Sequence, residues 1–217
     1  MIVDERMITY INSLSEDTNM FLNHLEQQAH KDHVPVIRKE MQSLLRVLLA
    51  VKHPENILEV GTAVGFSALF MCENVSDTCH ITTIEKYEKR ISAAKENFKK
   101  AGKEGQITLL TGDASERLKE LIEPFDFIFM DAAKGQYIHF LPDISRLLSP
   151  GGILLSDNVL QDGDIIESRF AVTRRNRTIH SRMREYLYTL THHPDFVTTI
   201  LPLGDGVTIS VKKGAER

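Results

Sequence analysis

Residues 56–67 read Asn-Ile-Leu-Glu-Val-Gly-Thr-Ala-Val-Gly-Phe-Ser, and the rest of the chain is organised around this stretch. Its apolar run at 57–60 is short, partly β-branched and bounded by residues that break strands, which is typical of a buried parallel strand. A glycine turn follows from Gly61 to Gly65, and residues 67–71 are a good start for a helix. A strand, a glycine turn and a helix in this order let a ligand approach bare backbone at the carboxyl edge of a sheet. The alternative is a tight turn that binds nothing.

Glu59 narrows the choice of ligand. A carboxylate just ahead of the turn repels a phosphate but suits a cationic ligand. The glycine spacing matches neither the dinucleotide fingerprint nor the triphosphate loop, which needs Gly-Lys followed by Ser or Thr. A positively charged ligand that contains adenosine fits best, and S-adenosylmethionine is such a ligand.

The composition indicates one domain over residues 1–217, with residues 1–33 as an N-terminal helical extension. The chain has 217 residues, of which 42% are hydrophobic, so it can bury a full core. No apolar run approaches the ~18 residues of a membrane helix, and the acidic N-terminus does not resemble a signal peptide. Cys72 and Cys79 are expected to pack as free thiols in a reducing compartment. We therefore expect a cytoplasmic protein without membrane association.

Strand and helix patterns alternate from Ile57 onward, which indicates an α/β fold with right-handed crossovers and helices on both faces of a mostly parallel sheet. Two late strands, 196–201 and 207–212, are separated by only five residues, so the last strand should be antiparallel to its neighbour. The other strands are expected at 57–60, 80–85, 106–110, 125–130 and 152–156, and helices at 65–75, 87–101, 115–122, 135–148 and 177–192.

Residues 4–31 carry two amphipathic helical patterns that precede this alternation, and residues 37–51 carry a third. The first two have no place inside a strand–helix alternation, so we expect them over the carboxyl edge of the sheet or at a subunit interface. The apolar faces are predicted to be Met7, Ile8, Ile11 and Leu14 in the first, Met20, Phe21, Leu25 and Gln28 in the second, and Leu44, Leu45, Leu48 and Leu49 in the third.

Acidic residues close several strands. Glu85 ends the second strand, 24 residues after Gly61, where nucleoside-binding α/β folds hold ribose hydroxyls with a carboxylate. Its alternative role is that of a neighbour to a helix N-cap. Asp113 follows the third strand and can cap the next helix, border an adenine, or do both.

Asp131 closes the fourth strand, and Asp157 and Asn158 close the fifth. They lie 26 residues apart, about one crossover unit, so both strand ends should meet at the same sheet edge. Two carboxylates and an amide form an all-oxygen cluster of the kind that Mg²⁺ prefers, although each acid alone could be a loop cap. Lys134, three residues after Asp131, could serve as a general base near such a cation or could simply be solvated.

A basic segment stands out from an acidic chain. The net charge is −4, but residues 169–184 contain six arginines and no acid, which leaves 20 basic against 30 acidic residues elsewhere. The segment is interpreted either as a contact for a polyanion or as a solvated helix face. The six arginines are Arg169, Arg174, Arg175, Arg177, Arg182 and Arg184.

The chain resembles a family from about Val34 to Lys213, the cation-dependent O-methyltransferases that use S-adenosylmethionine and include the catechol and caffeoyl-coenzyme A enzymes. The resemblance is carried by Leu-Glu-Val-Gly-Thr-x-x-Gly-x-Ser from Leu58, Asp-Ala-x-Lys-x-x-Tyr from Asp131, Ser-Asp-Asn from Ser156 and Leu-Pro-Leu-Gly-Asp-Gly from Leu201. It implies a Rossmann-like sheet of seven strands and, for bacterial members, commonly a homodimer. It also implies Lys134 as the catalytic base, Asp131, Asp157 and Asn158 as metal ligands, and Val36, Gly61, Ser67, Glu85, Asp113, Ala114 and Asp131 around the cofactor.

The family leaves the acceptor open. Small-molecule members surround the acceptor with aromatic residues or a coenzyme A site, whereas this chain has no tryptophan and carries its arginines after Ser-Asp-Asn. The bacterial branch to which it is most similar methylates 5-hydroxyuridine at the wobble position of tRNA, and the arginines would then contact RNA. A small catechol or related phenol is the alternative acceptor. An RNA-binding protein without catalysis is a third reading, against which the intact Asp131, Lys134, Asp157 and Asn158 argue.

Overall fold

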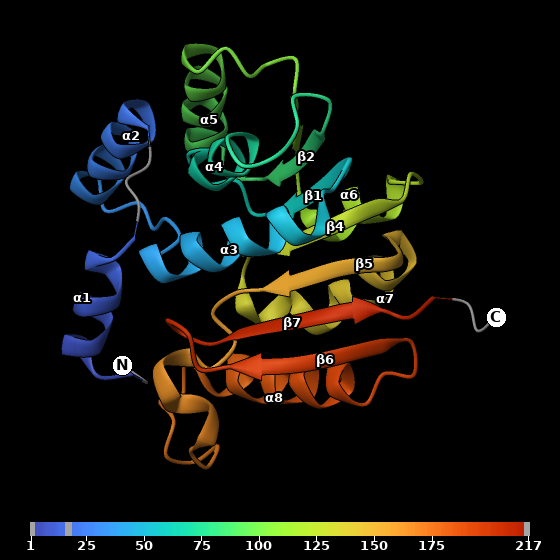
Figure 1. The fold of residues 1–217 in the computed structure, drawn as a ribbon. Coiled ribbons are helices and arrows are strands. Elements are labelled where there is room, and N and C mark those ends of the chain that lie inside the picture. Colours follow the sequence, from blue (N-terminus) through green and yellow to red (C-terminus); the bar gives the residue numbers. More distant parts are fainter. Residues whose placement is uncertain (1–2, 16–18, 215–217) are drawn as a thin grey trace.

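The computed structural model describes residues 3–15 and 19–214, and its centre is a sheet. In this part of the chain seven strands are joined in the order β3-β2-β1-β4-β5-β7-β6 (Figure 1). The first five in sequence run parallel, whereas β7 runs antiparallel to both β5 and β6. The predicted Rossmann-like α/β class, with an antiparallel last strand, is therefore confirmed. The strands are β1 (Asn56–Val60), β2 (His80–Glu85), β3 (Ile107–Thr111), β4 (Phe125–Met130), β5 (Leu148–Ser156), β6 (Phe196–Leu201) and β7 (Val207–Lys212).

Helices cover both faces of this sheet (Figure 1). One face packs against α3 (Lys39–Lys52), α4 (Phe66–Cys72) and α5 (Glu88–Lys100), and the other against α6 (Ala114–Glu120), α7 (Tyr137–Leu147) and α8 (Arg177–Thr191). Two short 3₁₀ helices, η1 (Lys134–Gln136) and η2 (Gln161–Ile166), follow β4 and β5. None of the helices in the described ranges is long and apolar enough to span a membrane.

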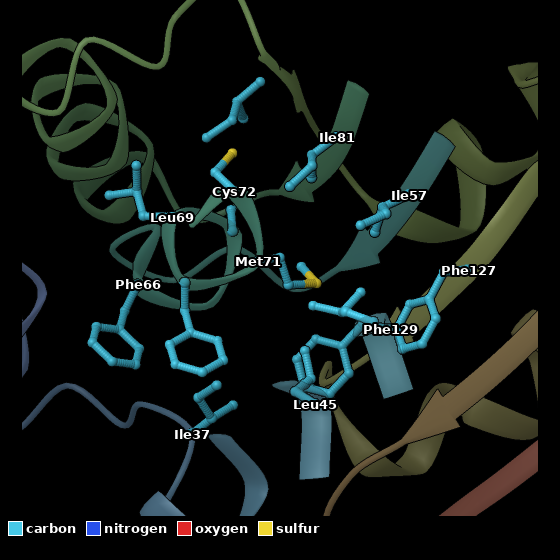
Figure 2. Packing of buried hydrophobic residues seen from close by; sticks show 14 of the residues in the cluster. Ile37, Leu45, Ile57, Phe66, Leu69, Met71, Cys72, Ile81, Phe127 and Phe129 are labelled. Carbon is cyan, nitrogen blue, oxygen red and sulfur yellow. The ribbon is translucent and has the colours of Figure 1, made fainter. Parts of the chain in front are cut away.

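Alternation along the central strands divides the core into two layers. Ile57 in β1 and Phe127 and Phe129 in β4 pack toward α3 and α4 (Figure 2). Leu58 and Ile128 point the opposite way, toward α7 and α8. Strands that are buried on both faces read as continuous apolar runs, which explains why the sequence located them well. Cys72 and Cys79 are buried free thiols, as expected.

β5 begins earlier than its apolar run suggests. Leu148 already pairs with Phe125, and the register then shifts before Ile153 pairs with Phe127. The residues between carry Pro150 and two glycines, which normally argue against a strand. The predicted start at residue 152 was therefore too late by four residues.

The N-terminal helices lie beside the sheet, on the side to which the β5 arrow points (Figure 1). α1 (Glu5–Ser13) packs on α3, and α2 (Met20–Lys31) packs on α4. The predicted apolar face of α1 is not buried, because that helix has no buried residue and Met7, Ile11 and Leu14 are exposed. The predicted face of α2 was half right: Leu25 is buried and Phe21 packs against the core, whereas Met20 and Gln28 are exposed. The buried residues of this helix are Leu22, Leu25, Glu26 and Ala29.

The turn between β6 and β7 packs against the chain segment that follows β5. Gly206 has a φ of +86°, and a Cβ atom there would lie 2.2 Å from Cγ of Leu160. The Val159 and Leu160 amides donate to the carbonyls of Gly206 and Asp205 at 2.9 and 2.8 Å. Only glycine permits this approach, which brings Asp205 to the same edge as the ends of the parallel strands.

Candidate active site

A cavity of about 770 Å³ opens at the carboxyl ends of the parallel strands. Its walls are the loops after β1 to β5, the segment before α3 and the β6–β7 turn. Cavities of this size and position commonly hold cofactors in α/β folds. The lining includes all of the residues predicted for cofactor, metal and catalysis except Glu59, namely Val36, Gly61, Ser67, Glu85, Asp113, Ala114, Asp131, Lys134, Asp157 and Asn158.

The glycine turn places bare backbone at the cavity wall. Gly61 has a φ of +107°, and a Cβ atom there would stand 2.2 Å from the carbonyl oxygen of Asp131. Gly65 is also left-handed, and its added Cβ would meet the ring of Phe98 at 2.5 Å. The two glycines are needed because β1, β4 and α5 approach the turn closely.

Glu85 is a buried carboxylate that backbone amides hold in place. Its Oε2 accepts from the Ala63 amide at 2.9 Å, and its Oε1 accepts from the amides of Lys86 at 3.0 Å and Tyr87 at 2.9 Å. The carboxylate therefore has a fixed orientation and still has lone pairs for ribose hydroxyls. This geometry fits the predicted ribose site.

Asp113 caps α6 and lines the cavity as well. Its Oδ1 accepts from the Ser115 hydroxyl at 2.7 Å and the Ser115 amide at 2.9 Å, and Lys86 Nζ lies 3.1 Å from Oδ2. These hydrogen bonds, with the Ser115 hydroxyl first, lower the pKa of Asp113 to about 2. The two roles that the sequence allowed, helix cap and cavity wall, are both seen.

Glu59 does not line the cavity, which corrects its predicted role as a ligand contact. It is fully buried beneath the glycine turn, where it accepts hydrogen bonds from the hydroxyls of Ser67 and Thr83. Burial raises its pKa to about 7, despite the opposing effect of the two hydroxyls. Its contacts make it a support for the cavity floor, since Ser67 does line the cavity.

Asp131, Asp157 and Asn158 meet where β4 and β5 end. Asn158 has a φ of +61°. Its backbone N–H donates to Asp157 Oδ1 at 2.6 Å, and its side-chain Nδ2 donates to Asp131 Oδ1 at 2.9 Å. Burial raises the pKa of Asp131, and burial followed by the Asp131 charge raises the pKa of Asp157 to about 7. Two mutually repelling carboxylates, Asp157 buried and Asp131 half-buried, fit a hard divalent cation beside an amide, because the cation would offset their repulsion. Within the described residues, no group of three or more His, Cys, Asp or Glu side chains gathers, so an amide is needed to complete this donor set.

Two tyrosines brace this cluster from below, and the sequence analysis gave them no role. The Tyr137 hydroxyl donates to the carbonyls of Met130 and Asp157, each 3.1 Å away. Tyr186 packs edge-on against Tyr137 with ring centroids 5.5 Å apart, and its hydroxyl lies 2.7 Å from Ser156 Oγ. The two hydroxyls thus form hydrogen bonds at the ends of β4 and β5, and the tyrosine pair fixes the distance between the strand ends that carry Asp131 and Asp157.

Lys134 is held by a residue that the sequence analysis also missed. Its Nζ lies 2.6 Å from Oδ2 of Asp205, which is buried and also accepts from the Asp162 amide. Asp205 thus connects η1, the β6–β7 turn and η2. The available signal was the Gly-Asp-Gly of the resemblance motif, to which no chemistry had been assigned.

The six arginines do not share one helix face. Arg169, Arg174 and Arg175 lie in the exposed segment before α8, and the other three lie on α8 itself. None of the six lines the cavity. The three on α8 are tied to backbone carbonyls: Arg177 Nε to Val172 at 3.3 Å, Arg182 Nη1 to Gly135 at 3.2 Å and Arg184 Nη1 to Ile165 at 2.9 Å. Arg177 and Arg184 therefore fasten α8 to the segment after β5, and Arg182 fastens it to the loop that carries Lys134, a role that a solvated helix face would not have.

Comparisons with known proteins agree with this geometry. The family described as O-methyltransferase matches residues 12–213. The O-methyltransferase ankF of Aspergillus thermomutatus is 32% identical over 187 residues, which cover 78% of this chain and 76% of that protein. The catechol O-methyltransferase of Niastella koreensis is 34% identical over 127 residues, which cover 57% of this chain and 58% of that protein. The SAH-bound Podospora anserina methyltransferase PaMTH1 has a TM-score of 0.87 at 29% identity, covering 97% of this chain and 95% of that one.

Proposed function

Because the chain belongs to the O-methyltransferase family, which matches residues 12–213, we propose that it is a Mg²⁺-dependent tRNA methyltransferase. It transfers a methyl group from S-adenosylmethionine to 5-hydroxyuridine at the wobble position of the anticodon and gives 5-methoxyuridine. The observation that carries the acceptor is the arginine-rich segment after β5, three of whose arginines are exposed ahead of α8. It begins eleven residues after Asn158, which lines the cavity.

The cofactor would lie across the glycine turn. Glu85 would accept from the two ribose hydroxyls, and Asp113 and Ala114 would border the adenine. The bare backbone of Gly61 allows close approach of the methionyl part. Bound S-adenosylmethionine supplies the methyl group, whose carbon–sulfur bond breaks as the bond to the acceptor oxygen forms. The SAH-bound Podospora relative supports this choice of cofactor.

Asp131, Asp157 and Asn158 would hold the cation. The Asn158 side chain now donates to Asp131 through Nδ2, so its amide must rotate to present Oδ1. The chemistry that bound Mg²⁺ supplies is a lowered pKa for an acceptor hydroxyl. 5-Hydroxyuracil places a hydroxyl beside a carbonyl, so it offers two neighbouring oxygens to a cation much as a catechol does.

Lys134 would take the proton of the acceptor hydroxyl at Nζ. The ion pair between Nζ and Asp205 Oδ2, at 2.6 Å, corresponds to the protonated lysine that this step leaves. Asp205 therefore both aims the amine and stabilises the ammonium after transfer.

A small catechol is the second candidate acceptor, and the Niastella relative named catechol O-methyltransferase favours it. Nucleoside mass spectrometry of tRNA from cells that lack the protein distinguishes the two. Accumulation of 5-hydroxyuridine with loss of 5-methoxyuridine supports the tRNA acceptor. Unchanged tRNA nucleosides, together with turnover of a catechol by the purified protein, would replace it with the phenol.

We also propose a homodimer that covers α1. This helix exposes Met7, Ile11 and Leu14 and buries nothing in the described part of the chain. An amphipathic helix with its apolar face in water is a site for association. Sedimentation equilibrium of the purified protein tests this directly, and a monomeric mass would refute it.

A further inference from the structure

Phe170 is an exposed aromatic residue in the middle of the arginine-rich segment. Its side chain is 82% exposed, although phenylalanine is normally buried. The ring lies in the exposed stretch between η2 and α8 that also carries Arg169, Arg174 and Arg175. Neither the proposed chemistry nor the fold of the core uses it.

Hydrogen bonds fix the backbone of the turn around Phe170. The amides of Ala171 and Val172 donate to the Ser168 carbonyl at 3.0 and 3.3 Å, and the Val172 side chain is buried. Arg177 binds the carbonyls of Val172 at 3.3 Å and Phe170 at 3.4 Å. The backbone on both sides of the ring is therefore held while the ring itself points away from the core.

A cation covers part of the ring. The Arg177 guanidinium carbon lies 5.9 Å from the Phe170 ring centroid, a cation–π distance. An aromatic ring flanked by arginines, beside further exposed cations, is the combination that binds unpaired bases. Stacking holds the base while cations hold the backbone.

The segment is also close to the reacting groups. η2 is linked to Asp205 through the Asp162 amide, and Asp205 is the partner of Lys134. Arg182 on α8 donates to the Gly135 carbonyl, next to Lys134. In Figure 1 the orange segment after β5 lies at the sheet edge where β5 ends. The stretch that carries Phe170 is thus joined at both of its ends, through η2 and α8, to elements that hold Lys134 and its partner.

We propose that Phe170 is a stacking subsite for an unpaired base that neighbours the methylated nucleotide in the RNA acceptor. This inference rests on the proposed RNA acceptor and deepens it, because it assigns the recognition of an unpaired loop to one ring. Contact between two copies of the chain is the competing use of an exposed ring. A two-fold contact at Phe170 would bring like-charged arginine segments together, which disfavours it.

The test uses Phe170→Ala, Phe170→Leu and Phe170→Tyr with a stem–loop RNA that carries 5-hydroxyuridine in its loop. Phe170→Ala should weaken RNA binding by about 5- to 100-fold, as expected for one lost stack. Phe170→Tyr should keep wild-type affinity, and Phe170→Leu should behave like the alanine variant because it lacks a π face. The salt dependence of binding should not change, because no phosphate contact is lost.

Ile122→Ala is the matched control, since Ile122 is 87% exposed between α6 and β4, at the opposite edge of the sheet. It should leave RNA affinity unchanged. A 2-aminopurine scan of the loop adds a direct readout, with one position quenched on binding by the wild type and Phe170→Tyr but not by Phe170→Ala.

Three results overturn the inference. If Phe170→Ala or Phe170→Leu binds RNA with wild-type affinity, Phe170 does not stack on a base, and the proposed function is unaffected. A lower molar mass of Phe170→Ala with unchanged RNA affinity assigns the ring to a contact between copies. A wild-type protein that neither binds nor methylates the RNA overturns the proposed function together with this subsite.

Discussion

Lys134 Nζ and Asp205 Oδ2 lie 2.6 Å apart although 71 residues separate them in the sequence. The contact exists because Gly206 lets the β6–β7 turn pack on Leu160. Asp205→Asn keeps an acceptor for the Asp162 amide but removes the charge that aims Lys134. We expect turnover to fall by about 100-fold, as for a reacting group displaced by an ångström, with unchanged affinity for S-adenosylmethionine. Steady-state kinetics and cofactor titration check this, and wild-type turnover in Asp205→Asn would show that the pair does not position the lysine.

Lys134 itself is expected to act on the chemical step. Lys134→Ala should lower turnover by about 10²- to 10⁴-fold, the range of a general base, with little change in acceptor binding. Alkaline buffer should restore part of the rate, because the acceptor hydroxyl then ionises in solution. Lys134→Arg is the matched control, since it keeps a cation for Asp205 yet cannot give up its proton. If arginine sustains normal turnover, charge at this position matters and proton uptake does not.

The acidic cluster should depend on a divalent cation. Asp157→Ala and Asn158→Ala should abolish methyl transfer and leave cofactor affinity largely intact. Asp131→Ala should damage both, because Asp131 lines the cavity and its side chain is predicted to contact the cofactor as well as the cation. Added Mg²⁺ should also raise the melting temperature of the wild type, since it offsets repulsion between the carboxylates of Asp131 and Asp157. Asp157→Asn should lose that shift. Full activity after exhaustive chelation would contradict a metal requirement.

Glu59 should make the stability depend on pH. Its pKa is about 7 in the folded protein against an ordinary 4.5, so the folded state retains a proton that the unfolded chain releases. The contribution of Glu59 to the free energy of unfolding is therefore fully present below pH 4.5. This contribution, about 3 kcal/mol, is lost as the pH rises through 7. Glu59→Gln mimics the protonated side chain and should remove this decline in urea unfolding at about pH 5 and about pH 8. Glu104→Gln, at an exposed site, serves as the control and should retain it. An unchanged decline in Glu59→Gln would assign the pH dependence to other groups.

The sequence located the strands and the acidic residues at their ends, because an apolar run and the residue that closes it are neighbours in the chain. β1 and β4 are buried on both faces, so residues 57–60 and 125–130 read as largely apolar runs. The residue that follows each run, Gly61 or Asp131, lines the cavity. The apolar face of α2 was partly misplaced because a helix at the margin of the fold buries only part of its stripe. Glu59 was misassigned because strand position cannot show whether a carboxylate faces a ligand or a hydroxyl pair beneath it.

The sequence did not predict the roles of residues whose partners lie far away in the chain. Asp205 and Tyr186 reach the site from a hairpin and a helix far along the chain, and only the packed fold pairs them with Lys134 and Ser156. The division of the arginines is of the same kind. Backbone carbonyls of the chain engage Arg177, Arg182 and Arg184, a contact that composition does not encode.

That division decides how the proposed RNA interface is tested. Arg169, Arg174 and Arg175 are exposed, and within the described ranges no hydrogen bond or ion pair engages their side chains. Replacing all three with alanine should weaken tRNA binding and flatten its salt dependence by roughly 0.7 to 0.9 in log–log slope per lost phosphate contact. Cofactor affinity should not change, because none of the three lines the cavity. Turnover of a small catechol should survive as well, since a neutral phenol gains little from a cationic segment outside the cavity.

A charge-matched triple variant, Lys95→Ala with Lys99→Ala and Lys119→Ala, removes the same charge from exposed sites on α5 and α6. It should lower tRNA affinity far less, because those lysines are not in the arginine-rich segment after β5. Equal losses in both triple variants would reduce the arginines to a general electrostatic attraction. Equal loss of tRNA and catechol turnover in the arginine variant would mean that the segment shapes the active site. Unchanged tRNA binding would return the arginines to solvent and leave the small phenol as the better acceptor.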